Sequence, residues 1–290
     1  MKPDAVDAIT GPTRNGRNLS IEAKGSIHDD ATAQQIGFRG GTVAGDVHLD
    51  QFAPLLLEAF GPAWFETGSL SMHFKYATTD GEPVIAFVER PGRNADDDGA
   101  QVRAWMETPD GVTVCEGSAS VGSPPEPSAL YARDLRAVDP STLRILKSIV
   151  VGEHLDGGVL VPRGVDQADR LAAGLVSEPL DWYAHVSPWG GPIASPLTTA
   201  QLLHWEPVQP LSRRLPKVVG MFGAIEIRYV HGPVLLDRSY HVTGIVTAVS
   251  DSPKTEVLWY DTQATGDDGT VVATCRMMTR FVKASTPLYA

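Results

Sequence analysis

The stretch Gly40-Gly41-Thr42-Val43-Ala44-Gly45 precedes a helical segment, and the same order returns as Gly190-Gly191-Pro192-Ile193-Ala194-Ser195 before a second helical segment. Three further pairs of short matches follow in the same order at similar offsets. These pairs are residues 74–76 with 227–229, 105–108 with 259–262, and 110–111 with 268–269. One such match can arise by chance, but four in one order indicate that the chain contains an internal duplication.

The segment after Gly45 has the pattern of an amphipathic helix. Its apolar residues recur at positions i, i+3, i+4, i+7 and i+8, which places them on one stripe of a helix. These residues are Phe52, Leu55, Leu56, Ala59 and Phe60. Such a stripe must face a core, so we expect a central helix that packs against the rest of its half.

Four strands are expected after the helix in each half, because β-branched and aromatic residues gather between turns rich in Gly, Asp and Pro. The predicted strands are residues 69–76, 83–90, 101–108 and 112–121, then 219–230, 234–249, 255–264 and 270–282. The start of the second half is less regular. We expect its opening strand within residues 145–161 and a short helix at 165–175.

One helix followed by an antiparallel meander gives a sheet that packs one face on the helix and can wrap around it. This is the hot-dog arrangement. The predicted fold class is therefore α+β, a tandem or double hot-dog in which each half is an antiparallel sheet around a central helix. We expect an N-terminal domain at 1–122 that carries the site, a proline-rich linker at 123–140, and a degenerate C-terminal domain at 141–290.

Composition excludes several classes of protein. The formal net charge is −11, with no block of Lys or Arg, which argues against nucleic-acid partners. No apolar run approaches the roughly 20 residues that cross a bilayer. Residues 1–7 lack the features of a secretory signal, and Cys115 and Cys275 cannot form a disulfide framework. We expect a soluble cytoplasmic protein without a metal or a cofactor.

His28, followed by Ile36-Gly37-Phe38 and then Gly45, carries a resemblance to a known family. The stretch resembles the MaoC-like dehydratase and R-specific enoyl-CoA hydratase family. Residues 190–196 look like the degenerate half of its fused double hot-dog members, and Glu178 takes the place of His28 there. The resemblance implies a substrate that is an acyl-CoA or acyl-carrier thioester. It also implies a pseudo-dimer within one chain, which can pair again as a homodimer.

In that family a carboxylate and a His handle the water and the proton, while a backbone N–H at the central helix start polarises the thioester carbonyl. His28 and Gly45 match the last two groups. A helix N-terminus suits the second task, because its donors are unpaired and its dipole is positive where enolate charge develops. The family's Asp is missing, because Ala23 stands five residues before His28. The Asn-Pro pair between them is Gly25-Ser26, and the His-Gly pair at the helix start is Ala44-Gly45.

Other charged residues are candidates for the missing functions. The Asp29-Asp30 pair and Asp46 are possible replacements for the carboxylate, and Arg39 and Lys75 are possible contacts for the phosphates of a CoA-like carrier. Each has a structural alternative. The Asp residues stand where helix caps are found, the two cations can be solvated surface charges, and His28 can serve only to hold a loop.

Three functions fit this sequence. The first is a hydratase- or dehydratase-like lyase on enoyl or 3-hydroxyacyl thioesters, with His28 as acid and base and the Gly45 N–H as oxyanion donor. The second is an acyl-CoA thioesterase, because the same fold can hydrolyse thioesters with a differently placed carboxylate. The third is a non-catalytic protein that binds or scaffolds acyl thioesters. We favour an enzyme of the first kind.

Overall fold

The computed structural model describes residues 7–92, 99–176 and 178–289. Most of the segment on which the secretory-signal prediction rests, residues 1–6, lies outside these ranges. The first half contains four helices, two of them short, and six strands. They are β1 (Ala8–Thr10), β2 (Arg14–Asn15), α1 (Asp30–Gln35), the 3-10 helix η1 (Gly45–Phe52), α2 (Ala53–Phe60), α3 (Trp64–Thr67), β3 (Ser69–Phe74), β4 (Pro83–Glu89), β5 (Gly99–Glu107) and β6 (Thr113–Gly122).

The second half repeats this plan with longer strands. Its elements are η2 (Pro140–Thr142), β7 (His154–Leu160), α4 (Gly164–Ala172), η3 (Asp181–Tyr183), α5 (Pro196–His204), η4 (Glu206–Val208), α6 (Gln209–Ser212), β8 (Gly220–Tyr229), β9 (Tyr240–Asp251), β10 (Thr255–Thr265), β11 (Val271–Val282), η5 (Lys283–Ser285) and η6 (Pro287–Tyr289). β7 therefore falls within the range predicted for the opening strand, whereas α4 begins one residue before the range predicted for the short helix and ends three residues before its end.

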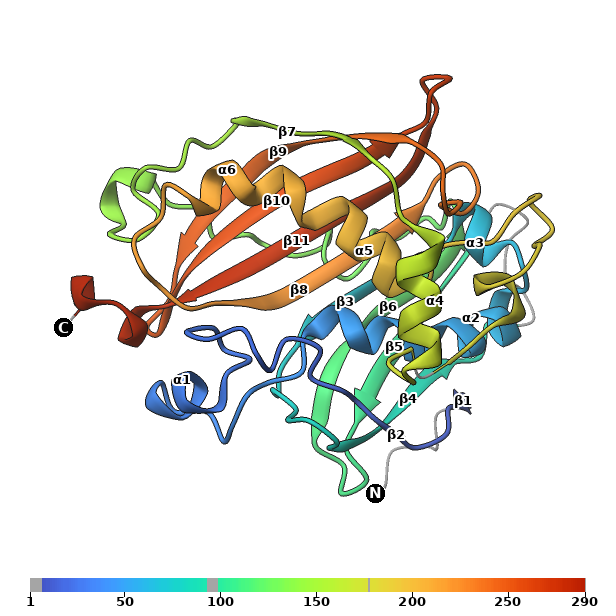
Figure 1. Cartoon of the computed structure of the whole chain (residues 1–290), viewed down its shortest axis with the longest axis horizontal. Coiled ribbons are helices and arrows are strands. Elements are labelled where there is room, and N and C mark those ends of the chain that lie inside the picture. The colour runs from blue at the N-terminus through green and yellow to red at the C-terminus, as the bar shows by residue number, and fades with distance from the viewer. Residues whose placement is uncertain (1–6, 93–98, 177, 290) are drawn as a thin grey trace.

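One antiparallel sheet runs through both halves, in the order β1-β4-β5-β6-β3-β8-β11-β10-β9-β7, with β2 paired to β4. Counted outwards from the central β3–β8 pair, the strands follow the same order in both halves. In this order β3, β6, β5 and β4 correspond to β8, β11, β10 and β9. Figure 1 shows this central pair where the two halves meet. The predicted α+β class and the predicted duplication are both visible in this topology.

A central helix packs against each half of the sheet. In the first half it begins as the 3-10 helix η1 at Gly45 and continues as α2. Pro54 lies in the first turn of α2, where its missing N–H removes no helical hydrogen bond. Of the predicted apolar stripe, Phe52, Leu55 and Leu56 are buried in the core. The corresponding helix of the second half is α5, and it packs along η1.

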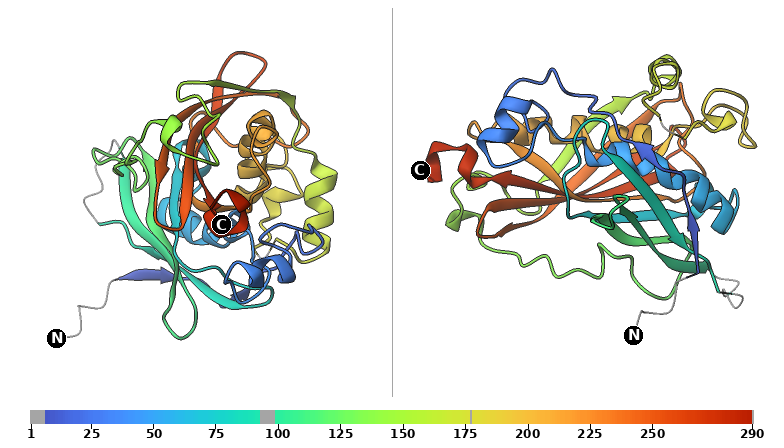
Figure 2. Two further views of the ribbon diagram at one scale, coloured as in Figure 1. Left: turned by 90° about the vertical axis from the view of Figure 1, so that its left-hand side faces the viewer. Right: turned by 90° about the horizontal axis from the view of Figure 1, so that it is seen from below.

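The central helices and the predicted linker, residues 123–140, lie on opposite faces of the sheet (Figure 2). On the outer face, Leu130 of the predicted linker packs with Trp259, Met278 and Ala248. β6 ends at Gly122 and η2 begins at Pro140, so no named helix or strand lies between them. The domain boundaries at 122 and 141 remain a prediction.

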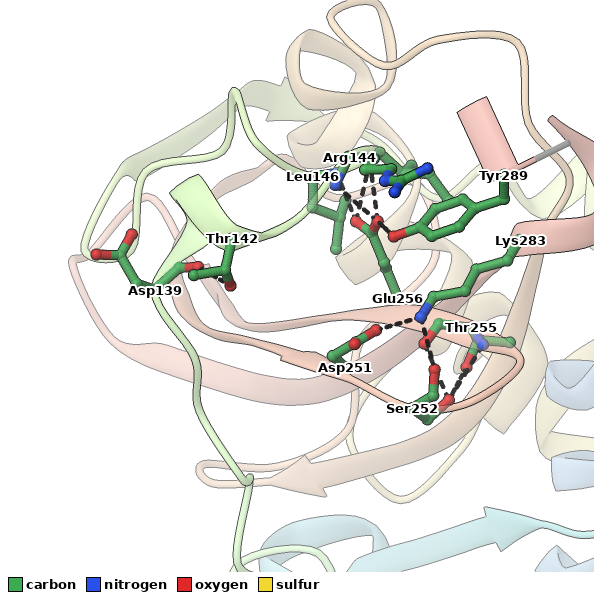
Figure 3. Close-up of polar contacts among 11 residues, drawn as sticks. Asp139, Thr142, Arg144, Leu146, Asp251, Ser252, Thr255, Glu256, Lys283 and Tyr289 are labelled. Atoms are coloured by element: carbon green, nitrogen blue, oxygen red, sulfur yellow. Dashed lines mark hydrogen bonds and ion pairs between the residues drawn. The ribbon is translucent and has the colours of Figure 1, made fainter. Parts of the chain in front are cut away.

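The residues before β7 do not extend it, and a buried carboxylate explains why. Glu256 of β10 accepts hydrogen bonds from the backbone N–H groups of Arg144, Ile145 and Leu146, at 2.9, 3.0 and 2.8 Å. The hydroxyl of Tyr289 donates to the same carboxylate (Figure 3). Because these N–H groups are bonded to a side chain, they are not available to a neighbouring strand.

Candidate functional site

The start of the first central helix offers a backbone donor. Gly45 is the first residue of η1 and is half-buried, and its N–H donates no hydrogen bond within the described part of the chain. A β-carbon at this position would lie 2.5 Å from Cζ of Phe74, so packing against this ring requires a glycine. The N–H, rather than open space beside the α-carbon, is therefore what Gly45 presents to a ligand.

His28 lies on the loop before α1 and is held in one orientation. Its Nδ1 donates a hydrogen bond to the carbonyl of Thr42 at 2.7 Å. The loop itself is tied down, because Asn18 donates to the His28 carbonyl at 2.8 Å and the Gly41 N–H donates to Asp30 at 2.7 Å. With Nδ1 donating, the neutral ring carries its lone pair on Nε2. In this tautomer Nε2 is the atom that can exchange a proton with a ligand, while Nδ1 holds the ring against the loop.

Two adjoining cavities meet at His28. The larger has a volume of about 1060 Å³ and is lined by Gly45, and the smaller has a volume of about 510 Å³. Five residues line both cavities: Ser20, His28, Ala44, Trp205 and Phe222. These volumes are in the range of sites for small organic ligands. His28 can therefore reach a ligand that extends from one cavity into the other.

The carboxylate candidate next to His28 in sequence does not line either cavity. Asp29 is buried and precedes α1, and it accepts a hydrogen bond from the Thr32 hydroxyl at 2.8 Å. This bond, with weaker contacts to Gly25 and Lys24, lowers the pKa of Asp29. Ala23 does line the larger cavity, so the place where the family has its Asp carries a methyl group. A catalytic role for Asp29 stays a prediction without a contact to support it.

Asp46 lies inside the site. It is the second residue of η1, is buried, and lines the smaller cavity, while the helix N-cap residue is Ala44. Its Oδ2 is 3.6 Å from Nε2 of His204, the last residue of α5. No sequence pattern joins these two residues, because they belong to different halves.

The two predicted phosphate contacts are placed differently. Arg39 donates to Glu82 at 2.8 Å and to the Ala77 carbonyl at 3.1 Å, and it lines neither cavity. Lys75 lines the larger cavity and forms an ion pair with Glu116. Of the two, only Lys75 is in a position to meet a ligand in that cavity.

Two arginines that were not among the predicted phosphate contacts line the larger cavity, together with Arg136, Lys254 and two acidic residues, Asp134 and Asp251. Arg133, from the segment after β6, and Arg280, from β11, both line it. Arg280 donates to Nε2 of His73 at 3.0 Å. Burial and then Arg133 lower the pKa of Arg280, and burial and the surrounding cations lower that of His73 to about 4. An anion bound here would relieve this repulsion.

Glu178, the counterpart of His28 in the second half, contacts the first half. It is buried and accepts hydrogen bonds from the guanidinium of Arg14.

Within the described ranges, no group of three or more His, Cys, Asp or Glu is placed to hold a metal ion. No helix in these same ranges is long and apolar enough to cross a membrane.

Comparisons with known proteins give the fold. No family model matches the sequence, and no curated protein matches it. Among solved structures, Rv0216 of Mycobacterium tuberculosis, a conserved hypothetical protein with a double hot-dog fold, is similar over 96% of this chain and 97% of its own, with a TM-score of 0.62 and 14% identity. This chain has the double hot-dog fold.

Two further solved structures that are similar to this chain over nearly its full length are named as dehydratases. A protein of Chloroflexus aurantiacus J-10-fl, assigned as a MaoC domain dehydratase, matches with a TM-score of 0.68 and 14% identity over 96% of this chain and 95% of its own. A MaoC-like dehydratase matches with a TM-score of 0.57 and 13% identity, over 97% and 99% of the two chains. The double hot-dog of this protein is a pseudo-dimer, in which each half supplies one central helix.

Proposed function

We propose that the protein is a hydratase- or dehydratase-type lyase that acts on an enoyl or 3-hydroxyacyl thioester. The observation that carries this proposal is that two groups lie around one cavity: His28, whose Nδ1 bond leaves Nε2 for a ligand, and the N–H of Gly45, which has no partner among the described residues. The likeness to structures named as dehydratases adds support at the level of the fold.

The chemistry needs a group that moves a proton at the α-carbon and a group that takes up the negative charge. The Thr42 carbonyl holds the His28 ring and its tautomer, so that Nε2 can remove a proton from Cα or, once protonated, return it. The Gly45 N–H donates to the thioester oxygen as the enolate forms. Such groups contribute roughly 10²- to 10⁴-fold and 10²- to 10³-fold to the rate, respectively.

The larger cavity suits the carrier end of the thioester. Its lining holds five cationic residues, Lys75, Arg133, Arg136, Lys254 and Arg280, against two acidic ones, Asp134 and Asp251. The excess of positive charge would bind the phosphates of CoA or of a carrier's phosphopantetheine arm. We therefore replace Arg39 with Arg133 and Arg280 in the proposed phosphate contacts. The acyl chain would then extend past His28 into the smaller cavity, whose lining includes Leu19, Val47 and other apolar residues.

The test is to incubate the purified protein with trans-2-enoyl-CoA and saturated acyl-CoA of several chain lengths, following loss of the enoyl absorbance and release of free thiol. We expect enoyl loss without thiol release. His28→Gln should lower this activity by roughly 10²-fold or more. His154→Gln, a change at an exposed histidine of β7, is the matched control and should keep it.

The same assay decides against the proposal in two ways. Thiol release would make the protein a thioesterase. Absence of both reactions, with a higher melting temperature in acyl-CoA, would make it a binding or scaffolding protein. A cytoplasmic location and pairing into a homodimer are further proposals, and fractionation of cells and the mass of the protein in solution test them.

A further inference from the structure

A buried acid and a buried histidine face each other across the two halves. Asp46 and His204 have side chains that are 5% and 4% exposed, and their nearest atoms, Oδ2 and Nε2, are 3.6 Å apart. Oδ1 of Asp46 and Nε2 of His204 have no hydrogen-bond partner among the described residues. Buried polar atoms without partners are costly and rare in folded proteins. Both residues line the smaller cavity, while these two atoms are themselves enclosed by protein.

The pair results from the antiparallel packing of the two central helices. At one end of the contact, Asp50 of η1 accepts a hydrogen bond from the N–H of Leu197, in the first turn of α5, at 2.7 Å. At the other end, the last residue of α5 reaches the first turn of η1. Phe222 packs edge-on against the His204 ring, with centroids 5.0 Å apart. The imidazole is thus held in place from two sides.

The order of groups along the cleft assigns them to parts of the substrate. Gly45 and the cations line the larger cavity, His28 stands where the cavities meet, and Asp46 and His204 line the smaller one. A thioester with its carrier at the cations and its carbonyl at Gly45 places the α-carbon at His28. The next carbon of the chain, the β-carbon, then enters the smaller cavity.

We propose that His204, positioned by Asp46, is the second acid–base residue of this site and activates the water that adds to the β-carbon. This assignment rests on the proposed lyase function. Asp46 faces Nε2 of the ring and stabilises its charged form, which leaves Nδ1 of His204 to contact the reacting water. The other acidic residues of the smaller cavity are placed less well, because Asp166, for example, is an exposed residue within ion-pair distance of Arg163.

In hydration, Nδ1 of neutral His204 takes a proton from water while the water oxygen bonds to the β-carbon. The electron pair of the carbon–carbon double bond moves toward the thioester oxygen, which the Gly45 N–H holds as an enolate. Protonated His28 then gives its proton to the α-carbon. His204 releases a proton to solvent and His28 takes one up, so the enzyme returns to its starting state. Dehydration follows the same steps in reverse.

Two reactions of one protein separate the two histidines. Hydration of trans-2-enoyl-CoA needs both, whereas exchange of the α-hydrogen of saturated acyl-CoA for deuterium in heavy water needs only His28 and Gly45. We expect His204→Gln to lower kcat for hydration by about 10²-fold or more and to change KM and the exchange rate by less than about threefold. His28→Gln should lower both reactions. Asp46→Asn should follow His204→Gln with a smaller loss, and Asp46→Glu should recover part of it.

Gln51→Met is the matched control for a buried polar change on the same helix. Gln51 also has unpartnered amide atoms but lines neither cavity, so we expect this variant to keep both reactions. Thermal melting of every variant shows that it is folded. If the unaltered protein hydrates enoyl-CoA and His204→Gln does so at a similar kcat, the role of His204 is refuted and the lyase function stands. If the unaltered protein shows no hydration, both proposals fail.

Discussion

Glutamine in place of Glu256 should destabilise the protein strongly, although the side chain hardly changes in size. The carboxylate is fully buried and takes hydrogen bonds from three consecutive backbone N–H groups, those of residues 144–146, and from the hydroxyl of Tyr289. Bonds to a charged acceptor contribute about 1.5–3 kcal/mol each. A glutamine keeps one acceptor oxygen and turns an NH₂ group toward N–H donors. We expect a loss of about 3 kcal/mol of unfolding free energy.

Thermal unfolding followed by circular dichroism measures this effect. A loss of that size lowers Tm by about 6–12 °C in a protein of this length class. Glu58→Gln is the control, because Glu58 also accepts from an arginine, Arg90 at 2.9 Å, but both side chains are about half exposed. Exposed ion pairs contribute roughly 0–1 kcal/mol, so Tm should fall by less than about 4 °C. Equal melting temperatures for Glu256→Gln and Glu58→Gln would refute the reasoning.

Three other changes have predictable effects. Burial raises the pKa of Asp50 from 3.8 to about 7. The stability that this group contributes is therefore present below pH 3.8 and is lost as pH rises through 7. In urea unfolding, the free energy of unfolding of Asp50→Asn should rise relative to that of the unaltered protein by on the order of 2–4 kcal/mol between pH 4 and 8. Burial lowers the pKa of His48 from 6.5 to about 4, so stability is complete above pH 6.5 and falls toward pH 4, and His48→Gln should flatten that decline. Gly45→Ala should cost about 1–3 kcal/mol in the same assay through its contact with Phe74, and Phe74→Leu should restore part of it; no recovery would mean that the contact is not the cause.

The repeated parts of the fold were predictable because their signals are local. Alternating β-branched residues and glycine-rich turns marked the strands, and the predicted equivalence of Trp105 and Trp259 holds, since they lie on β5 and β10. The strand predicted from residue 234 begins at Tyr240 instead. The backbone turns at Asp237, whose φ is 56°, and the strand cannot start before that turn.

The site was only partly predictable, because its members come from distant parts of the chain. His28 and Gly45 were found from short motifs, and both line the larger cavity. The sequence offered no signal that His204 would face Asp46, since this contact depends on how α5 and η1 pack. It also could not show that Arg39 would bind Glu82 while Arg280 lines a cavity, because the partner of a cation is set by tertiary structure.

The pseudo-symmetry itself argues that the site belongs to the first half. Each half starts its central helix at the shared interface, so each could in principle offer N–H groups to a ligand. At the start of α5 the protein uses these groups itself: Pro196 has no N–H, Asp50 accepts that of Leu197 at 2.7 Å, and Ser195 accepts that of Thr198 at 3.2 Å. At the start of η1 no such partner meets the N–H of Gly45 among the described residues, and a cavity lies beside it. Duplication thus left two equivalent helix ends, of which one is closed by side chains and the other can meet the thioester oxygen of the proposed substrate.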